Sequence, residues 1–82
     1  MAATNGKTSV IKTLFIVVLS DNTKSAKFSG LTSLINSEKT ITDLAKKHSL
    51  TVSVSNGNIT VFCQDEGSIS KFVKVLVLNN II

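Results

Sequence analysis

The residues best suited to chemistry are His48 and Cys63, the one histidine and the one cysteine of this 82-residue chain. A thiolate activated by an imidazole is a nucleophile, but the pair must lie within about 3 Å of each other and needs a third group to orient the imidazole. The sequence indicates no such third group. We therefore predict a histidine at a helix end, a buried cysteine, no catalytic residues and a protein that is not an enzyme.

Metal and cofactor sites are not indicated either. Structural zinc needs four cysteine, histidine or carboxylate ligands, and no close spacing supplies them. Asp65 and Glu66 precede Gly67, where a negative charge would favour the start of a helix. Phosphate-binding loops place several glycines before a helix, whereas Gly30 and Gly67 stand alone. We expect no metal and no cofactor.

The basic residues are all lysine, and the formal net charge is +4. Lys12, Lys24 and Lys27 lie in the N-terminal third and could contact phosphates, which would give salt-dependent affinity without sequence specificity. Arginine, tyrosine and tryptophan are absent. The four phenylalanines all lie in apolar patterns, so we expect no surface on which bases stack.

Composition limits the class of protein. Apolar residues make up 43% of the chain and charged residues 17%, which is typical of a globular domain with a core. Lysine in place of arginine, with many isoleucines and asparagines, is typical of A+T-rich genomes and suggests a phage or a low-GC bacterium. The apolar run of residues 14–19 is too short for a signal peptide or a membrane span. We therefore expect a cytoplasmic protein without a membrane partner.

The first half of the chain predicts a β-hairpin. Residues 10–20 are rich in β-branched and aromatic types, and the continuous apolar run 14–19 indicates a central strand covered on both faces or nearly so. Asp21, Asn22 and Thr23 have side chains that stabilise turns. Residues 24–28 alternate and predict a weaker strand at the edge of the sheet.

Helical spacing follows. Ser29 is the expected N-cap of a helix with Leu31, Leu34 and Ile35 on its apolar side, and the same spacing continues to residue 48. Thr40, with Asp43 three positions later, resembles a capping box that would restart the helix after a break near residues 36–37. One helix or two remain open.

The stretch Thr40–Ser53 resembles the first helix and turn of bacterial helix-turn-helix repressors, with Ala45 at the helix crossing and Leu50 at the turn. The resemblance implies a DNA-recognition helix in the residues that follow. Those residues, 52–57, are instead β-branched, alternating and interrupted by Asn56-Gly57. They predict a second hairpin, with a type I′ turn at this dipeptide.

The last element has two possible forms. Apolar residues recur at spacings of three and four from Ile69 to Val77, which predicts a closing helix to about Leu76. Alternation of Val73, Val75 and Val77 would also suit a strand.

Together these elements predict an α+β fold, in which two ββα units form a four-stranded, mostly antiparallel sheet with the helices packed on one face. The alternative is a ferredoxin-like βαββαβ fold, in which residues 71–78 are the last strand and residues 24–28 are loop. Residues 1–9 are expected to be a flexible tail, and residues 10–82 a single small domain.

The predicted function is that of a small regulatory or adaptor module that binds a protein partner or a second copy of itself. The residues expected to do so are Ser25, Ala26, Lys27 and Phe28 of the edge strand. Nucleic-acid binding through Lys12, Lys24 and Lys27 is the alternative.

Overall fold

The computed structural model describes residues 11–34 and 37–82. Its elements are β1 (Thr13–Val18), β2 (Asp21–Ser29), the 3-10 helix η1 (Thr32–Leu34), α1 (Glu38–Lys47), β3 (Thr51–Ser55), β4 (Asn58–Cys63) and α2 (Glu66–Leu78). The predicted order of two ββα units is therefore present. The predicted tail, residues 1–9, lies outside the described residues, as do Val10, Ile35 and Asn36.

The four strands form one mixed sheet in the order β2-β1-β4-β3. Each hairpin is antiparallel, whereas β1 and β4 lie side by side in parallel. The α+β class is confirmed, and antiparallel pairing is confirmed for the hairpins only. The chain leaves the sheet at the edge strand β2 and returns through α1 to the other edge, β3, so β4 fills the place beside β1.

The two halves of the chain are alike in element order but not in position within the sheet. In the first unit the leading strand, β1, is central, whereas in the second unit the leading strand, β3, is at the edge. The two ββα units are therefore not related by a simple structural repeat.

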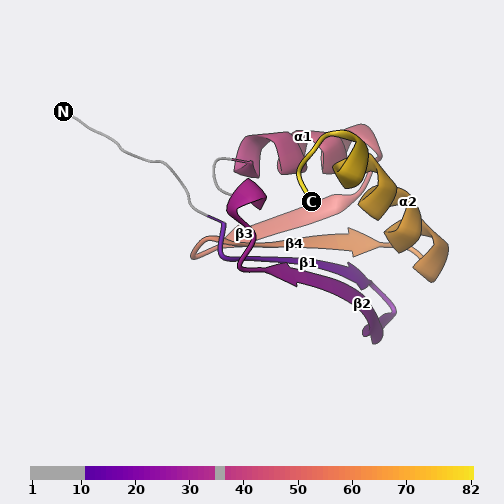
Figure 1. The fold of residues 1–82 in the computed structure, drawn as a ribbon. Coiled ribbons are helices and arrows are strands. Elements are labelled where there is room, and N and C mark those ends of the chain that lie inside the picture. Colours follow the sequence, from indigo (N-terminus) through magenta and orange to yellow (C-terminus); the bar gives the residue numbers. More distant parts are fainter. Residues whose placement is uncertain (1–10, 35–36) are drawn as a thin grey trace.

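Both helices lie over the same face of the sheet (Figure 1). The side chains of β1 and β4 that point toward them are buried, as are the apolar positions of α1 and α2. The core consists of Ile11, Leu14, Ile16, Val18, Leu34, Ile41, Ala45, Ile59, Val61, Cys63, Ile69, Phe72, Leu76 and Ile81.

No helix or strand within residues 11–34 and 37–82 covers the other face of the sheet. Phe15 and Val17 of β1 point to that face and are only partly buried. Within the described residues, the prediction of a strand covered on both faces, or nearly so, is therefore correct for the helix-covered face only. An apolar run shows that a strand is central but not whether a second layer exists, because outward positions of a central strand are partly sheltered by their neighbours.

The two turns differ. Asn56 and Gly57 have φ values of 50° and 80°, which confirms the type I′ turn between β3 and β4. The first hairpin turns earlier than predicted, at residues 19–20, and Asp21 already begins β2. The pairing of β1 with β2 shifts register between Val17 and Val18, which marks a bulge in the hairpin. Asp21 lies in this bulge, and its Oδ1 accepts a hydrogen bond from the Thr23 backbone N–H at 3.0 Å.

The first helix also begins later than predicted. Ser29 ends β2 and Thr40 lies inside α1, so neither is an N-cap. The chain first forms η1, which buries Leu34, and α1 then begins after Ser37. At its other end the Leu50 N–H donates to the Ala45 carbonyl at 2.8 Å, and Ser49 has a φ of 60°. This is a Schellman-type end, in which an apolar residue beyond the helix packs back onto it.

Residues 66–78 form α2, and Ile69, Phe72 and Leu76 are its buried positions. The ferredoxin-like alternative is therefore wrong, because residues 71–78 are helix and residues 24–28 are strand. The region expected to hold a recognition helix in a helix-turn-helix repressor is the β3–β4 hairpin. Within the described residues, no helix has the length and apolar character needed to cross a membrane.

Candidate functional site

The predicted binding strand lies at an edge of the sheet. β2 pairs only with β1, so one side of its backbone has no neighbouring strand within the described residues. Ser25 and Lys27 are exposed, whereas Ala26 and Phe28 are partly buried and pack against the core. The four predicted residues thus alternate between the two faces of the sheet.

The uncovered face of the sheet carries two aromatic side chains. Phe15 of β1 pairs with Thr60 of β4, and Phe62 of β4 pairs with Val17 of β1. Because paired residues point to the same face, these four side chains lie together on the side away from the helices. Phe15, Val17 and Phe62 are all partly exposed. We call this group of three the aromatic strip.

The surroundings of the aromatic strip are polar. Most of the other strand positions on this face carry hydroxyl groups, among them Thr13, Ser25, Ser29, Ser53, Ser55 and Thr60. Lys27 pairs with Phe15, and its ammonium nitrogen lies 5.8 Å from the centroid of the Phe15 ring. That distance is within the range of a cation–π contact.

The three lysines predicted to contact nucleic acid do not form one patch. Lys24 lies 3.7 Å from the carboxylate of Glu66, at the start of α2, and so points toward the helices. Lys27 lies over the opposite face. Lys12 is exposed just before β1, where its backbone N–H donates to the Gly57 carbonyl. Only Lys27 accompanies the aromatic strip.

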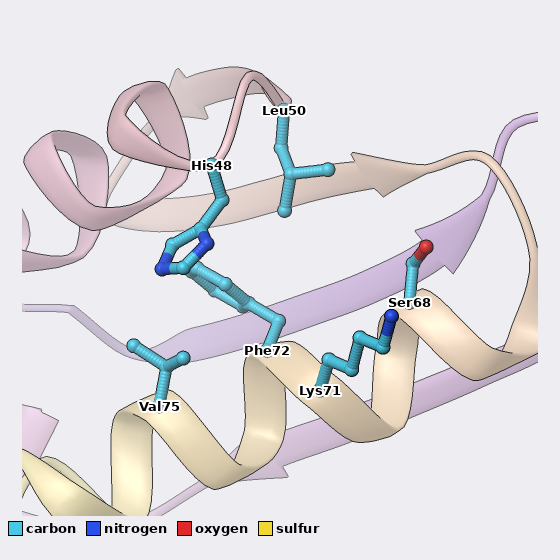
Figure 2. A pocket seen from close by; sticks show the side chains of 6 residues that line it. All are labelled: His48, Leu50, Ser68, Lys71, Phe72 and Val75. Carbon is cyan, nitrogen blue, oxygen red and sulfur yellow. The ribbon is translucent and has the colours of Figure 1, made fainter.

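A small pocket of about 120 Å³ opens between the end of α1 and the side of α2. Figure 2 shows His48 and Leu50 on one side of it and Ser68, Lys71, Phe72 and Val75 of α2 on the other. The His48 and Phe72 rings meet edge to face, with centroids 6.5 Å apart. Pockets for drug-sized ligands are about 300 to 1,000 Å³, so this one fits only a few water-sized groups.

Cys63 is 1% exposed on the helix-covered side of β4. Burial raises the pKa of the Cys63 thiol, and the negative charge of Asp65 raises it further. Both effects favour the unreactive thiol over the thiolate. Cys63 is absent from the lining of the pocket that contains His48. Within the described residues, no group of three or more histidine, cysteine, aspartate or glutamate side chains could hold a metal ion.

The sequence does not predict the aromatic strip, because all four phenylalanines lie in apolar patterns and are expected to be in the core. For Phe62 a signal was present. Along β4 the buried residues are Ile59, Val61 and Cys63. Phe62 and Thr60 occupy the alternate positions and so point to the opposite face. Strict alternation therefore assigns Phe62 to the polar face. For Phe15 no such signal exists, because its neighbours in β1 are apolar on both sides.

Comparison of the chain with models of protein families, with curated proteins and with solved structures found no significant match.

Proposed function

We propose that the protein is a small non-enzymatic adaptor that binds a polypeptide strand along β2, and that a second copy of the chain is the simplest such partner. The observation that carries the proposal is the position of β2 at the edge of the sheet. At nine residues, from Asp21 to Ser29, β2 is longer than β1, β3 and β4. An exposed strand offers a row of backbone donors and acceptors to an incoming strand.

The side chains of β2 support a partner on one face of the sheet. Ala26 and Phe28 point toward the helices and pack against the core, but they stay partly exposed at its margin. An added strand would place alternate side chains beside them and extend the apolar layer beneath α2. Burial of apolar surface stabilises such an assembly by about 25 cal/mol per Å². Pairing of two small domains would thus increase the stability of both.

The first experiment measures self-association by light scattering over a wide concentration range. In the variant Ala26→Lys, a charged side chain replaces a small one at the margin of the core. The lysine would lie beside the apolar side chains of the incoming strand. We expect the unaltered protein to dimerise at high concentration and Ala26→Lys to remain monomeric. The matched control is Val54→Lys. Val54 lies on the same face of the sheet but on the opposite edge strand, β3, and its side chain is 43% exposed.

A second measurement uses the unaltered protein, so its result does not depend on whether a variant folds. Amide hydrogen exchange of the unaltered protein should show protection of β2 that increases with concentration, with no such increase in β3. Two results contradict self-pairing at β2. One is a monomer at every concentration, and the other is a dimer whose exchange protection increases in β3 instead.

A further inference from the structure

We propose that the uncovered face of the sheet binds single-stranded nucleic acid, with bases stacked on Phe15 and Phe62 and a phosphate near Lys27. This inference concerns the open face of the sheet and not the free backbone edge of β2, although Lys27 belongs to that strand, and it does not rest on strand addition at the edge. Stacking on aromatic side chains is a general means of binding unpaired bases, because every base has a flat π-face.

The geometry places the two rings suitably for neighbouring bases. Phe15 and Phe62 lie on the adjacent central strands β1 and β4, displaced by two residues along the parallel register. Strand spacing and rise place their Cβ atoms about 8 Å apart. Two bases joined by one backbone linkage can span that separation only when they are unstacked from each other. Paired bases inside a duplex are not accessible in this way, so the surface favours a single strand.

The charge of the surface matches a polyanion. None of the residues paired with positions 13 to 17 of β1 on this face, nor their partners on β3, carries a carboxylate, and Asp21 lies beyond the register shift at the start of β2. The acidic residues Asp65 and Glu66 lie instead at the start of α2, over the other face. The Lys27 ammonium lies 5.8 Å from the centroid of the Phe15 ring, and a base that stacks on this ring would displace the long lysine side chain toward the adjoining phosphate. The chain carries a formal charge of +4. Because β2 lies on the far side of β1 from β4, the phosphate that could approach the Lys27 ammonium is the one that flanks the base on Phe15 on its β2 side.

The hydroxyl groups around the strip provide donors and acceptors without fixing one sequence. Thr60 lies beside Phe15 on β4, and Ser53 lies beside Thr60 on β3. Hydroxyl groups can donate to phosphate oxygens or accept from base edges. Protein interfaces have polar rims as well, so it is the Lys27 cation, with no carboxylate among the residues paired with Phe15 and Val17, that favours nucleic acid over a second sheet packed face to face.

The direct experiment uses fluorescently labelled single strands of oligothymidylate and oligouridylate, with a hairpin duplex of equal length for comparison. Anisotropy at low salt should show binding of one or both single strands and much weaker binding of the duplex. Comparison of the two single strands distinguishes a DNA ligand from an RNA ligand. Phe15→Leu and Phe62→Leu keep an apolar side chain on the sheet but remove the ring, and each should weaken binding by about tenfold. The matched control is Phe72→Leu, a buried phenylalanine of α2 on the helix-covered side, which should leave the affinity unchanged.

Because the chain contains no tryptophan, a single introduced tryptophan would be a specific fluorescent reporter. In Phe15→Trp the affinity should be retained, and the emission should be quenched when a base stacks on the indole. Lys27→Gln should lower the slope of log affinity against log salt concentration by about 0.7, the value for one phosphate contact to a single strand. Lys74→Gln, which changes an exposed lysine of α2, should leave the slope unchanged.

Four results would overturn the proposal. The first is the absence of binding at low salt. The second is affinity that Phe15→Leu and Phe62→Leu do not reduce, since lysines alone would then explain it. The third is an equal loss in Phe72→Leu, which would indicate a general effect on the fold. The last is a change in oligomeric state in the Phe15 and Phe62 variants without nucleic-acid binding, which would identify the surface as a protein interface.

Discussion

The Ser68 backbone N–H donates to Asp65 Oδ1 at 2.8 Å, and the Ser68 hydroxyl donates to the same oxygen at 3.0 Å. Asp65 is thus the N-cap of α2, as predicted from its place before Gly67. These hydrogen bonds favour the ionised carboxylate and lower the pKa of Asp65 below its ordinary value of 3.8. The bonds from Ser68 are the largest cause, and the charge of Lys71 adds to them.

The first prediction concerns the pH dependence of this cap. Because the pKa of Asp65 is lower in the folded protein, its contribution to stability is present above its ordinary value of 3.8 and is lost as the pH falls through the folded value. Asp65→Asn keeps an acceptor but does not titrate. We expect the unaltered protein to be the more stable of the two near neutral pH and their thermal midpoints to converge in acid. A difference that stays constant with pH would contradict this prediction.

The second prediction tests the assignment of faces along β1. Ile16 is fully buried against the helices, whereas its neighbour Val17 lies on the uncovered face. Ile16→Ala should lower the free energy of unfolding by about 2 to 5 kcal/mol, because it leaves a cavity in the core. Val17→Ala should lower it by only about 1 kcal/mol or less, because little apolar area is lost.

Chemical denaturation of both variants measures the difference. Both substitutions replace a β-branched residue by alanine in the same strand, so backbone propensity affects them alike. Equal losses of stability would indicate that both faces of β1 are covered. In that case the aromatic strip would not be available to a ligand.

The third prediction concerns the reactivity of Cys63. Its burial and raised pKa should make it react slowly with an aromatic disulfide reagent in the folded protein and rapidly after denaturation. The positive control is Ser20→Cys in a Cys63→Ala background, which places a thiol at an exposed turn position. The released chromophore measures both rates. Fast reaction of native Cys63 at neutral pH would restore the possibility of a nucleophilic thiol.

Local elements could be predicted where their cause is local. The Asn56-Gly57 turn follows from two residues that accept positive φ, and α2 follows from apolar spacings of three and four. The start of α1 was missed because Ser29 and Thr40 are both suitable N-caps by type. The extended pairing of Ser29 with Thr13 and the packing of Leu34 in the core determine which residues are free to begin a helix.

The candidate site was only half predictable. Alternation along residues 24–28 correctly indicated an edge strand, since an edge strand needs fewer apolar residues than a central one. The aromatic strip was not predicted, because it depends on two segments that are far apart in the chain. Phe15 and Phe62 come together only when β4, rather than β3, lies beside β1.

The amino-acid sequence by itself determined the hairpins, the closing helix, the cap of α2 and the absence of a recognition helix after residue 50. These features depend on backbone preferences and side-chain periodicity within a few residues. The tertiary structure alone decided the parallel pairing of β1 with β4 and the side on which both helices pack. Those outcomes arise from burial of apolar surface between distant segments, and they leave one face of the sheet, with Phe15 and Phe62, directed away from the core.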